Sequence, residues 1–383
     1  MLDSEPANNY RNQLEREGQR WATKSQEREI KRSWLQSSVV LQRANRRVTG
    51  DESIPWLQWV DKEFLSQTER KLGLSLGCND GLFERQLVRT GICQRLDGMD
   101  VSPQAITLAQ EAAAQENIPA SFAVADVNNL QLPRERYDMV FAVMAMHHFA
   151  SLEHVLGQIN RTLKPNGFLV LNEFVGPSRF QWTEQQLSLA NDALHLLPPN
   201  RRRLRDGSVR EVIVAPDTAE MERTDPFEAI RSADIISQVN QHLDIVARRD
   251  YGGTILHLVL HDIVHNFDET QDGDCELLNM LCGIEEIALK RGLIDSDFTV
   301  IVARKRRTSN TAGNHGERQK ADRVVACDIG IEESQKRISQ LEATLEVREG
   351  ELRELESLLR AIERGIVLRL LNLLQGLRRR ARL

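Results

Sequence analysis

A glycine turn between a short apolar segment and a helical one is the first stretch that could do chemistry. Residues 72–76 alternate leucine with small residues, GCNDG follows at 77–81, and residues 82–88 carry apolar side chains at helical spacing. A strand, a tight turn and a helix N-terminus expose backbone N–H groups, so a ligand can approach the main chain. The turn therefore predicts a ligand cradle, although such glycines also have a purely steric explanation.

Acidic side chains follow the next two predicted strands, where a nucleoside would need them. Asp100 lies about 20 residues past the glycine turn, where a carboxylate accepts hydrogen bonds from ribose hydroxyls. Val101 would then face an adenine ring, and Asp126, followed by Val127, would accept from the adenine amine. Ligands of open parallel sheets bind beyond the carboxyl ends of the strands, so we expect these groups to meet in one site.

The elements that must position these residues alternate between strand and helix from 70 to 175. Strands are expected at 71–76, 95–99, 120–125, 137–144 and 167–174, and helices at 81–91, 102–117 and 151–163. Ser102 and Pro103 make a good helix start, with serine as the N-cap and proline at the first helical position. This alternation predicts an α/β fold with a parallel sheet covered on both faces.

The glycine spacing separates two classes of nucleoside ligand. NAD sites need G-x-G-x-x-G, whereas this turn has G-x-x-x-G, which suits a nucleoside without a pyrophosphate. With Ser75 at the place of the usual acid and Asn79 at that of the middle glycine, the turn resembles the first motif of class I S-adenosylmethionine-dependent methyltransferases. The family's later motifs are matched by Asp100, Asp126, Asp138 in YDMVFA, and LKPNGFLVLNE at 163–173.

The resemblance implies S-adenosyl-L-methionine as the cofactor and a doubly wound Rossmann-like sheet whose antiparallel last strand is 298–303. Ser75 weakens the expected contacts to the methionine amino group, whereas Asn79 tolerates a left-handed backbone better than other non-glycine residues. The cofactor-binding residues so implied are Gly77, Cys78, Asn79, Gly81, Asp100, Val101, Asp126, Val127 and Met144.

Three side chains are candidates for proton transfer from the methyl acceptor. His148, beside His147, follows the fourth strand near the expected methyl group, and Glu173 lies late in the fifth strand. His257 follows a Tyr-Gly-Gly-Thr turn. A structural role is an open alternative for each histidine. His257 also shares i, i+4, i+8 spacing with His261 and His265 on a helix predicted at 254–266, but no HExxH pattern accompanies them, so no metal site is predicted.

A narrower resemblance is to a bacterial methyltransferase subgroup linked to cell-surface polysaccharide biosynthesis. The stretches that carry it are NRRVTGD at 45–51, GPSRFQW at 176–182, DPFEAIRSADII at 225–236 and YGGTILHLVL at 251–260. This resemblance implies O-methylation of a sugar or glycan hydroxyl. The rival interpretation is a non-catalytic coiled-coil scaffold in which the altered first motif marks a weakened cofactor site.

Composition argues against several other classes of protein, namely nucleic-acid-binding, secreted and membrane-spanning proteins. The net charge of −6 provides no basic field for nucleic acid, and the five scattered cysteines suit a reducing compartment. The polar N-terminus lacks a signal-peptide pattern, and no apolar run approaches the roughly 20 residues that span a bilayer. We therefore expect a cytoplasmic protein that does not bind nucleic acid.

The chain divides by composition into five parts. They are an N-terminal helical cap at 1–68, a methyltransferase domain at 69–305 with a substrate-covering insertion at 176–242, a linker at 306–330, a coiled coil at 331–362, and a basic amphipathic helix at 363–383. The cap and the insertion are expected to close over the acceptor. The last helix has a wide leucine face and an arginine cluster, which suit an anionic membrane surface, although its leucines could also extend the coil.

The coiled coil predicts a homo-oligomer. Its seam repeats every seven residues at Ile331, Ile338, Leu345, Leu352, Leu359, Ile366 and Leu373. An ordinary straight helix drifts by about 20° per heptad relative to such a repeat. A chain ending at Lys305 should therefore be monomeric while the full chain associates, as measured by analytical ultracentrifugation. Equal association states for the two chains would contradict the prediction.

Overall fold

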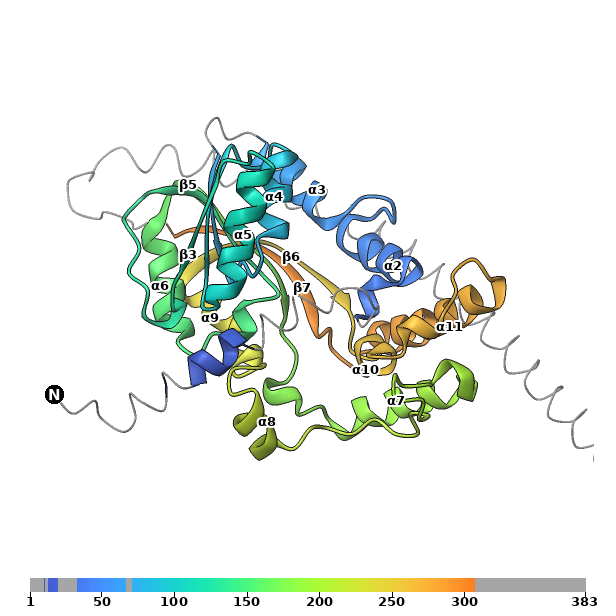
Figure 1. Ribbon diagram of the computed structural model, residues 1–383. Helices are drawn as coiled ribbons and strands as arrows, with labels where there is room; N and C mark the ends of the chain where they lie inside the picture. The colour runs from blue at the N-terminus through green and yellow to red at the C-terminus, as the bar shows by residue number, and fades with distance from the viewer. Residues whose placement is uncertain (1–9, 11–12, 20–32, 67–70, 307–383) are drawn as a thin grey trace, which may run out of the picture. The chain divides into compact units, whose positions relative to one another are not determined.

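The computed structural model describes residue 10 and residues 13–19, 33–66 and 71–306 (Figure 1). The predicted coiled coil at 331–362 and basic helix at 363–383 lie outside the described residues, as does nearly all of the predicted linker. Within the described residues, no helix has the length and apolar character that a membrane span requires.

A seven-stranded sheet forms the centre of the fold, in the order β3-β2-β1-β4-β5-β7-β6. Strands β1 to β5 pair in parallel, and β7 runs antiparallel between β5 and β6. The predicted doubly wound sheet with an antiparallel last strand is confirmed. The strands are β1 (Leu72–Leu76), β2 (Arg95–Asp100), β3 (Ala120–Val124), β4 (Tyr137–Val143), β5 (Leu163–Phe174), β6 (Leu243–Gly252) and β7 (Phe298–Lys305).

Helices cover both faces of the sheet, because alternate residues of each central strand bury in opposite directions. In β5, Val170 joins the apolar cluster that contains α2, α4 and α11, whereas Leu169 and Leu171 join the cluster that contains α6 and α9. The helices are α2 (Ser38–Thr49), α3 (Trp56–Val60), α4 (Leu82–Arg89), α5 (Pro103–Gln115), α6 (Leu152–Thr162), α7 (Glu184–His195), α8 (Thr218–Thr224), α9 (Ile235–His242), α10 (Leu256–Leu260) and α11 (Asp272–Lys290).

Local polar contacts fix where several elements begin. The Ser102 hydroxyl accepts a hydrogen bond from the Ala105 N–H at the start of α5, with proline at the first helical position, as predicted. Asp138, at the start of β4, accepts from the Leu72 N–H at 3.0 Å and from the Lys164 ammonium at 2.8 Å. Asp138 therefore joins β1, β4 and β5 at the end of the sheet opposite the carboxyl ends of the parallel strands.

One predicted helix is longer than the helix that the structure shows. The helix expected at 254–266 stops at Leu260, because His261 turns to an extended conformation and Asp262 takes a positive φ of 56°. His257, His261 and His265 therefore do not share one face of a helix. In the predicted N-terminal helical cap, residue 10 and residues 13–19 are helical, and the next α-helix begins at Ser38.

Tryptophans of the N-terminal region pack onto the rest of the domain. Trp34 is buried and stacks on Tyr251 with ring centroids 6.1 Å apart. Trp56 stacks on Phe83 of α4. These contacts anchor residues 33–65 to the domain, so the predicted cap is continuous with its core.

Ser75 of β1 and Glu84 of α4 form a buried pair beneath the glycine turn. The Ser75 hydroxyl donates to Glu84 Oε1 at 2.6 Å, and both side chains are buried. Glu84 thus brings a carboxylate from the helix to the place where the family motif has its acid on the strand. Burial, which is only partly offset by this hydrogen bond, raises the pKa of Glu84 to about 7.

This pair predicts a pH-dependent contribution to stability. The Glu84 pKa is raised on folding, so its contribution to the free energy of unfolding is full below about pH 4.5 and is lost as pH rises through 7. From pH 5 to pH 8 the wild type should lose about 2–3 kcal/mol relative to Glu84→Gln, measured by urea unfolding. Glu111→Gln, at an exposed position of α5, is the matched control, and its stability should depend on pH as that of the wild type does. Parallel pH profiles for wild type and Glu84→Gln would contradict the assignment.

Candidate active site

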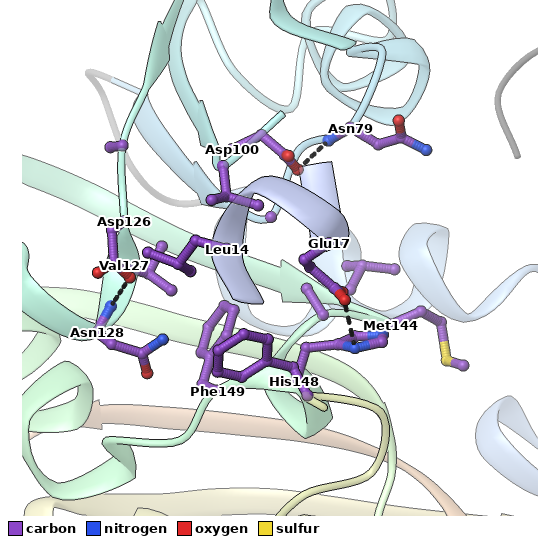
Figure 2. A pocket seen from close by; sticks show the side chains of 16 residues that line it. Leu14, Glu17, Asn79, Asp100, Asp126, Val127, Asn128, Met144, His148 and Phe149 are labelled. Atoms are coloured by element: carbon purple, nitrogen blue, oxygen red, sulfur yellow. Dashed lines mark hydrogen bonds and ion pairs between the residues drawn. The ribbon is translucent and has the colours of Figure 1, made fainter. Parts of the chain in front are cut away.

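Two cavities open beyond the carboxyl ends of the parallel strands, and Met144 lines both of them. The small cavity, about 260 Å³, lies at the ends of β1, β2 and β4 (Figure 2). The large cavity, about 790 Å³, lies at the ends of β4 and β5, and most of its lining comes from segments that follow β5 in the chain. All of the predicted cofactor-binding residues except Cys78 and Gly81 line the small cavity.

The glycine turn shapes one wall of the small cavity through its backbone. Gly77, Asn79 and Gly81 have positive φ values of 75°, 46° and 68°. A Cβ on Gly77 would lie 2.5 Å from the Ala145 Cβ, so both space and conformation require glycine there. Asn79 adopts the left-handed backbone expected of it. The Cys78 side chain is buried in the core beside α5, so Cys78 and Gly81 shape the turn without lining the cavity.

Asp100 holds the turn and faces the small cavity. Its Oδ2 accepts from the Asn79 N–H at 2.8 Å and its Oδ1 accepts from the Ser102 N–H at 2.9 Å. Burial raises the pKa of Asp100, while hydrogen bonds from backbone N–H groups oppose the rise. Each carboxylate oxygen can accept a second hydrogen bond, so Asp100 can still bind two ligand hydroxyls.

Asp126 is the second carboxylate in this cavity. Its Oδ1 accepts from the Asn128 N–H at 3.0 Å, and its Oδ2 accepts from Asn129 Nδ2 at 2.7 Å and from the Tyr10 hydroxyl at 2.9 Å. Val127 lies beside it in the cavity wall. The order along the chain, an acid and then an apolar side chain, repeats that of Asp100 and Val101.

A short N-terminal helix at 13–19 forms the outer wall of the small cavity, as Figure 2 shows. Leu14 and Glu17 line the cavity, and the Gly18 carbonyl accepts from the Ser102 hydroxyl at 2.8 Å. The N-terminal cap was expected to close over the acceptor, whereas this part of it covers the small cavity. The i, i+4, i+7 spacing of Tyr10, Leu14 and Glu17 was the available sequence signal.

Met144 separates the two cavities. It has a positive φ of 51°, which is uncommon for a non-glycine residue, and its N–H donates to the Asn172 carbonyl at 2.8 Å. This bend at the end of β4 turns the chain into the short helix at Met146–His148 that carries both histidines. Backbone strain of this kind concentrates at functional sites.

Aromatic rings form much of the large cavity. Phe180 and Trp182 are stacked with centroids 5.3 Å apart, and Phe174 and Phe298 pack beside them. Arg210 adds one cationic side chain to the wall. Phe180 and Trp182 belong to the stretch 176–182, and sequence reasoning assigned none of these five side chains an individual site role. The cavity can accept a molecule with a flat or apolar face together with polar groups.

Glu173 is fully buried and lines neither cavity. Its Oε1 accepts from the N–H groups of Ala145 and Met146 at 2.5 and 2.6 Å. Its Oε2 accepts from the Phe174 N–H at 3.1 Å and lies 2.7 Å from His147 Nδ1. Because it is out of reach of a ligand, Glu173 acts as a positioning residue that orients His147.

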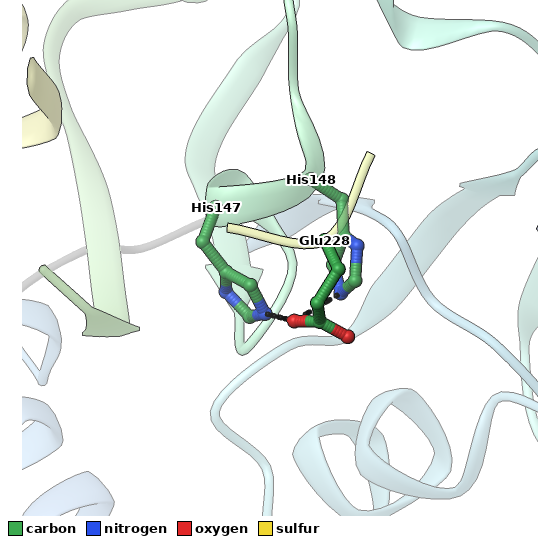
Figure 3. Close-up of side chains that lie close together, drawn as sticks. All are labelled: His147, His148 and Glu228. Atoms are coloured by element: carbon green, nitrogen blue, oxygen red, sulfur yellow. Dashed lines mark ion pairs between the residues drawn. The ribbon is translucent and has the colours of Figure 1, made fainter. Parts of the chain in front are cut away.

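His147, His148, Asp225 and Glu228 gather where the two cavities meet, and we name them the junction cluster. Both imidazoles turn their Nε2 atoms toward Glu228 Oε1, at 3.6 Å from His147 and 3.9 Å from His148 (Figure 3). His147 lines the large cavity and His148 the small one. Asp225 and Glu228 follow α8 in a turn.

His257 lies at the start of α10 in the wall of the large cavity. The buried Glu285 carboxylate fixes this turn by accepting from the N–H groups of Gly253, Ile255 and Leu256 at 2.7–2.9 Å. Burial, followed by the nearby His261, lowers the pKa of His257 to about 3. His257 is therefore a neutral hydrogen-bonding group. His261 also lines this cavity, whereas His265 does not.

Comparisons with known proteins agree with this architecture. A family profile described as Methyltransferase domain matches residues 74–171. A malonyl-[acyl-carrier protein] O-methyltransferase from Legionella pneumophila is 26% identical over 136 residues, 35% of this chain and 46% of that protein. A ubiquinone biosynthesis O-methyltransferase from Rhodopseudomonas palustris is 31% identical over 98 residues, 26% of this chain and 38% of that protein. This chain thus spans less than half the length of either relative.

Among solved structures, a phosphoethanolamine N-methyltransferase 2 from Haemonchus contortus in complex with S-adenosyl-L-methionine aligns with 71% of this chain and 58% of its own. The sequence identity is 15% and the TM-score 0.42.

The segment 74–171 that the family profile matches contains the glycine turn, both acidic strand ends and the two histidines. The family profile and the two curated relatives support a class I S-adenosylmethionine-dependent methyltransferase domain in this chain.

Proposed function

We propose that the protein transfers a methyl group from S-adenosyl-L-methionine to a hydroxyl oxygen of an acceptor bound in the large cavity. The observation that carries the proposal is the pair of cavities that share Met144, with the junction cluster between them. One cavity suits a nucleoside and the other is large enough for a second molecule. A transferase of this kind must hold donor and acceptor in line at a short distance.

The side chains that line the small cavity fit the cofactor. Asp100 can accept from both ribose hydroxyls, and Asp126 can accept from an exocyclic amine. Val101, Val127 and Leu14 offer apolar surface to a purine ring. The carboxylates also favour a ligand that carries positive charge.

When bound, S-adenosyl-L-methionine supplies an electrophilic methyl group on a sulfonium sulfur. The chain's own residues then orient the partners and remove a proton. Asp100 and the glycine turn hold the nucleoside end, and Met144 lies at the boundary that the methyl group must cross. The short N-terminal helix at 13–19 excludes water from the donor side.

The junction cluster receives the proton of the acceptor hydroxyl. Among the catalytic candidates from the sequence, His148 belongs to this cluster, and Glu173 serves it by orienting His147. His257, with its low pKa, is a weak base, so its part in the proposal is to hydrogen-bond the acceptor.

A sugar or glycan hydroxyl is the proposed acceptor, as the resemblance to enzymes of surface polysaccharide biosynthesis suggests. Aromatic faces beside Asp225 and Glu228 support it, because a sugar presents both C–H faces and hydroxyl donors. The two O-methyltransferases named above are described as acting on malonyl-[acyl-carrier protein] and in ubiquinone biosynthesis. For this reason the activity screen should also include thioester-linked acids and quinone precursors as acceptors.

Cofactor binding is the first test. S-adenosylhomocysteine should bind the full chain in calorimetry, and Asp100→Ala should weaken it by about 10-fold to 100-fold, since a hydrogen bond to a charged group contributes about 1.5–3 kcal/mol. Asp206→Ala, in an exposed loop, is the matched control and should bind as the wild type does. Absence of binding by the wild type at millimolar ligand would contradict the enzyme proposal and favour the scaffold.

Turnover tests the junction cluster. In a methyl-transfer screen over activated sugars, glycans, acyl thioesters and phenols, His148→Ala should lower kcat by roughly 10²–10⁴ without loss of cofactor affinity. The surface variant His195→Ala controls for the removal of an imidazole. Full turnover by His148→Ala on the best acceptor would mean that the cluster takes no part in the reaction.

A further inference from the structure

We propose that His147, His148 and Glu228 of the junction cluster bind a divalent transition-metal ion. The candidate ligand atoms, two imidazole nitrogens and one carboxylate oxygen, all lie within 4.8 Å of one another. The three side chains are largely buried, with exposed fractions of 6%, 11% and 15%. They therefore form a built site rather than a chance meeting of surface groups.

The separations suit ligands around an ion better than direct hydrogen bonds. Glu228 Oε1 lies 3.6 Å from His147 Nε2 and 3.9 Å from His148 Nε2 (Figure 3). A hydrogen bond between nitrogen and oxygen is about 2.7–3.2 Å long. Two ligands that each lie about 2.1 Å from a tetrahedral ion are about 3.4 Å apart. A small inward movement of each side chain would complete the coordination.

His147 is oriented as metal ligands are, and His148 presents the same ring nitrogen to Glu228. His147 Nδ1 lies 2.7 Å from Glu173, which directs Nε2 toward Glu228. His148 Nδ1 lies 3.4 Å from Glu17 Oε1, again with Nε2 on the side of Glu228. A carboxylate behind a histidine fixes the imidazole tautomer and raises its basicity as a ligand. Glu173 gives His147 this arrangement, whereas the 3.4 Å between His148 Nδ1 and Glu17 Oε1 is an ion-pair distance beyond the range of a hydrogen bond.

The ligand types select the class of ion. Imidazole suits zinc, copper, iron or nickel, and the carboxylate also suits manganese, whereas magnesium and calcium prefer oxygen ligands alone. No thiolate belongs to the cluster. Three protein ligands leave coordination positions open, and the large cavity, which His147 and Glu228 line, is where they would face.

The consequence for catalysis rests on the function proposed above. An open position could hold the acceptor oxygen and make its hydroxyl more acidic. The proton would pass to Asp225, which lines the same cavity, as the oxygen–methyl bond forms and the sulfur–methyl bond breaks. The histidines would then hold the ion, and Asp225 would be the base of the junction cluster.

The test measures metal binding alone, without cofactor or acceptor, so its outcome is independent of methyl transfer. The full chain, dialysed against EDTA and then buffer, is titrated with zinc chloride, and with manganese chloride in a second series, by calorimetry. We expect one ion per chain. His147→Ala and Glu228→Gln should each weaken binding at least 100-fold, and Glu173→Gln should weaken it by about 10-fold to 100-fold through the orientation of His147.

Two controls make the result decisive. His195→Ala removes a histidine from α7 and should bind as the wild type does. Circular dichroism checks that each variant folds, and His148→Ala replaces any variant that does not. Absence of binding by the wild type, or equal binding by the cluster variants, would overturn the proposal. Loss of binding in Glu17→Gln and Asp225→Asn but not in Glu228→Gln would overturn it too, in favour of the neighbouring group Glu17, His148 and Asp225.

Discussion

The hydrogen bonds of the Glu173 carboxylate are the interaction on which the site depends most. One buried side chain at the end of β5 accepts from the Ala145 and Met146 N–H groups of the neighbouring turn and orients His147. A buried carboxylate must be satisfied in this way, because an ionised group without donors would cost several kcal/mol. The requirement to satisfy Glu173 therefore fixes the turn after β4, and with it the bend at Met144 and the position of both histidines.

Much of the fold and half of the site could be predicted, since both follow from strand ends. In a parallel sheet the carboxyl ends of β1, β2 and β4 meet at one edge, so Gly77, Asp100 and Met144 had to share a cavity once the strands were assigned. The continuous apolar run Leu169–Leu171 equally required helices on both faces, because successive side chains of a strand point to opposite faces of the sheet.

The rest of the site depends on contacts between residues far apart in the chain, which no local pattern reveals. Glu228 reaches the histidines from a turn about 80 positions away, and the helix at 13–19 folds back over Asp100 and Asp126. The helix predicted at 254–266 failed because Asp262 takes a left-handed conformation that apolar spacing does not encode. Glu173 was predicted from its place at a strand end, yet its burial turned a candidate base into a positioning residue.

The pairing of Ser75 with Glu84 places a buried carboxylate beside the position at which the first motif lacks its usual acid. The sequence lacks the acid expected on β1, which alone would favour a weakened cofactor site. A carboxylate nevertheless occupies the space beneath the glycine turn, because α4 places Glu84 one turn after Gly81 and the Ser75 hydroxyl binds it. Because Glu84 lines neither cavity, this carboxylate supports the turn from below and leaves the contact to the methionine amino group unassigned.

Charge in the small cavity bears on the direction of the proposed reaction. Glu17, Asp100 and Asp126 surround the space where the cofactor would lie. Methyl transfer removes the positive charge of the sulfonium, so the substrate form of the cofactor gains more from these carboxylates than its product does. The difference persists only while the short N-terminal helix excludes water, because solvent screens such interactions. By excluding water, the helix at 13–19 thus strengthens the preference of the small cavity for the charged cofactor over its neutral product.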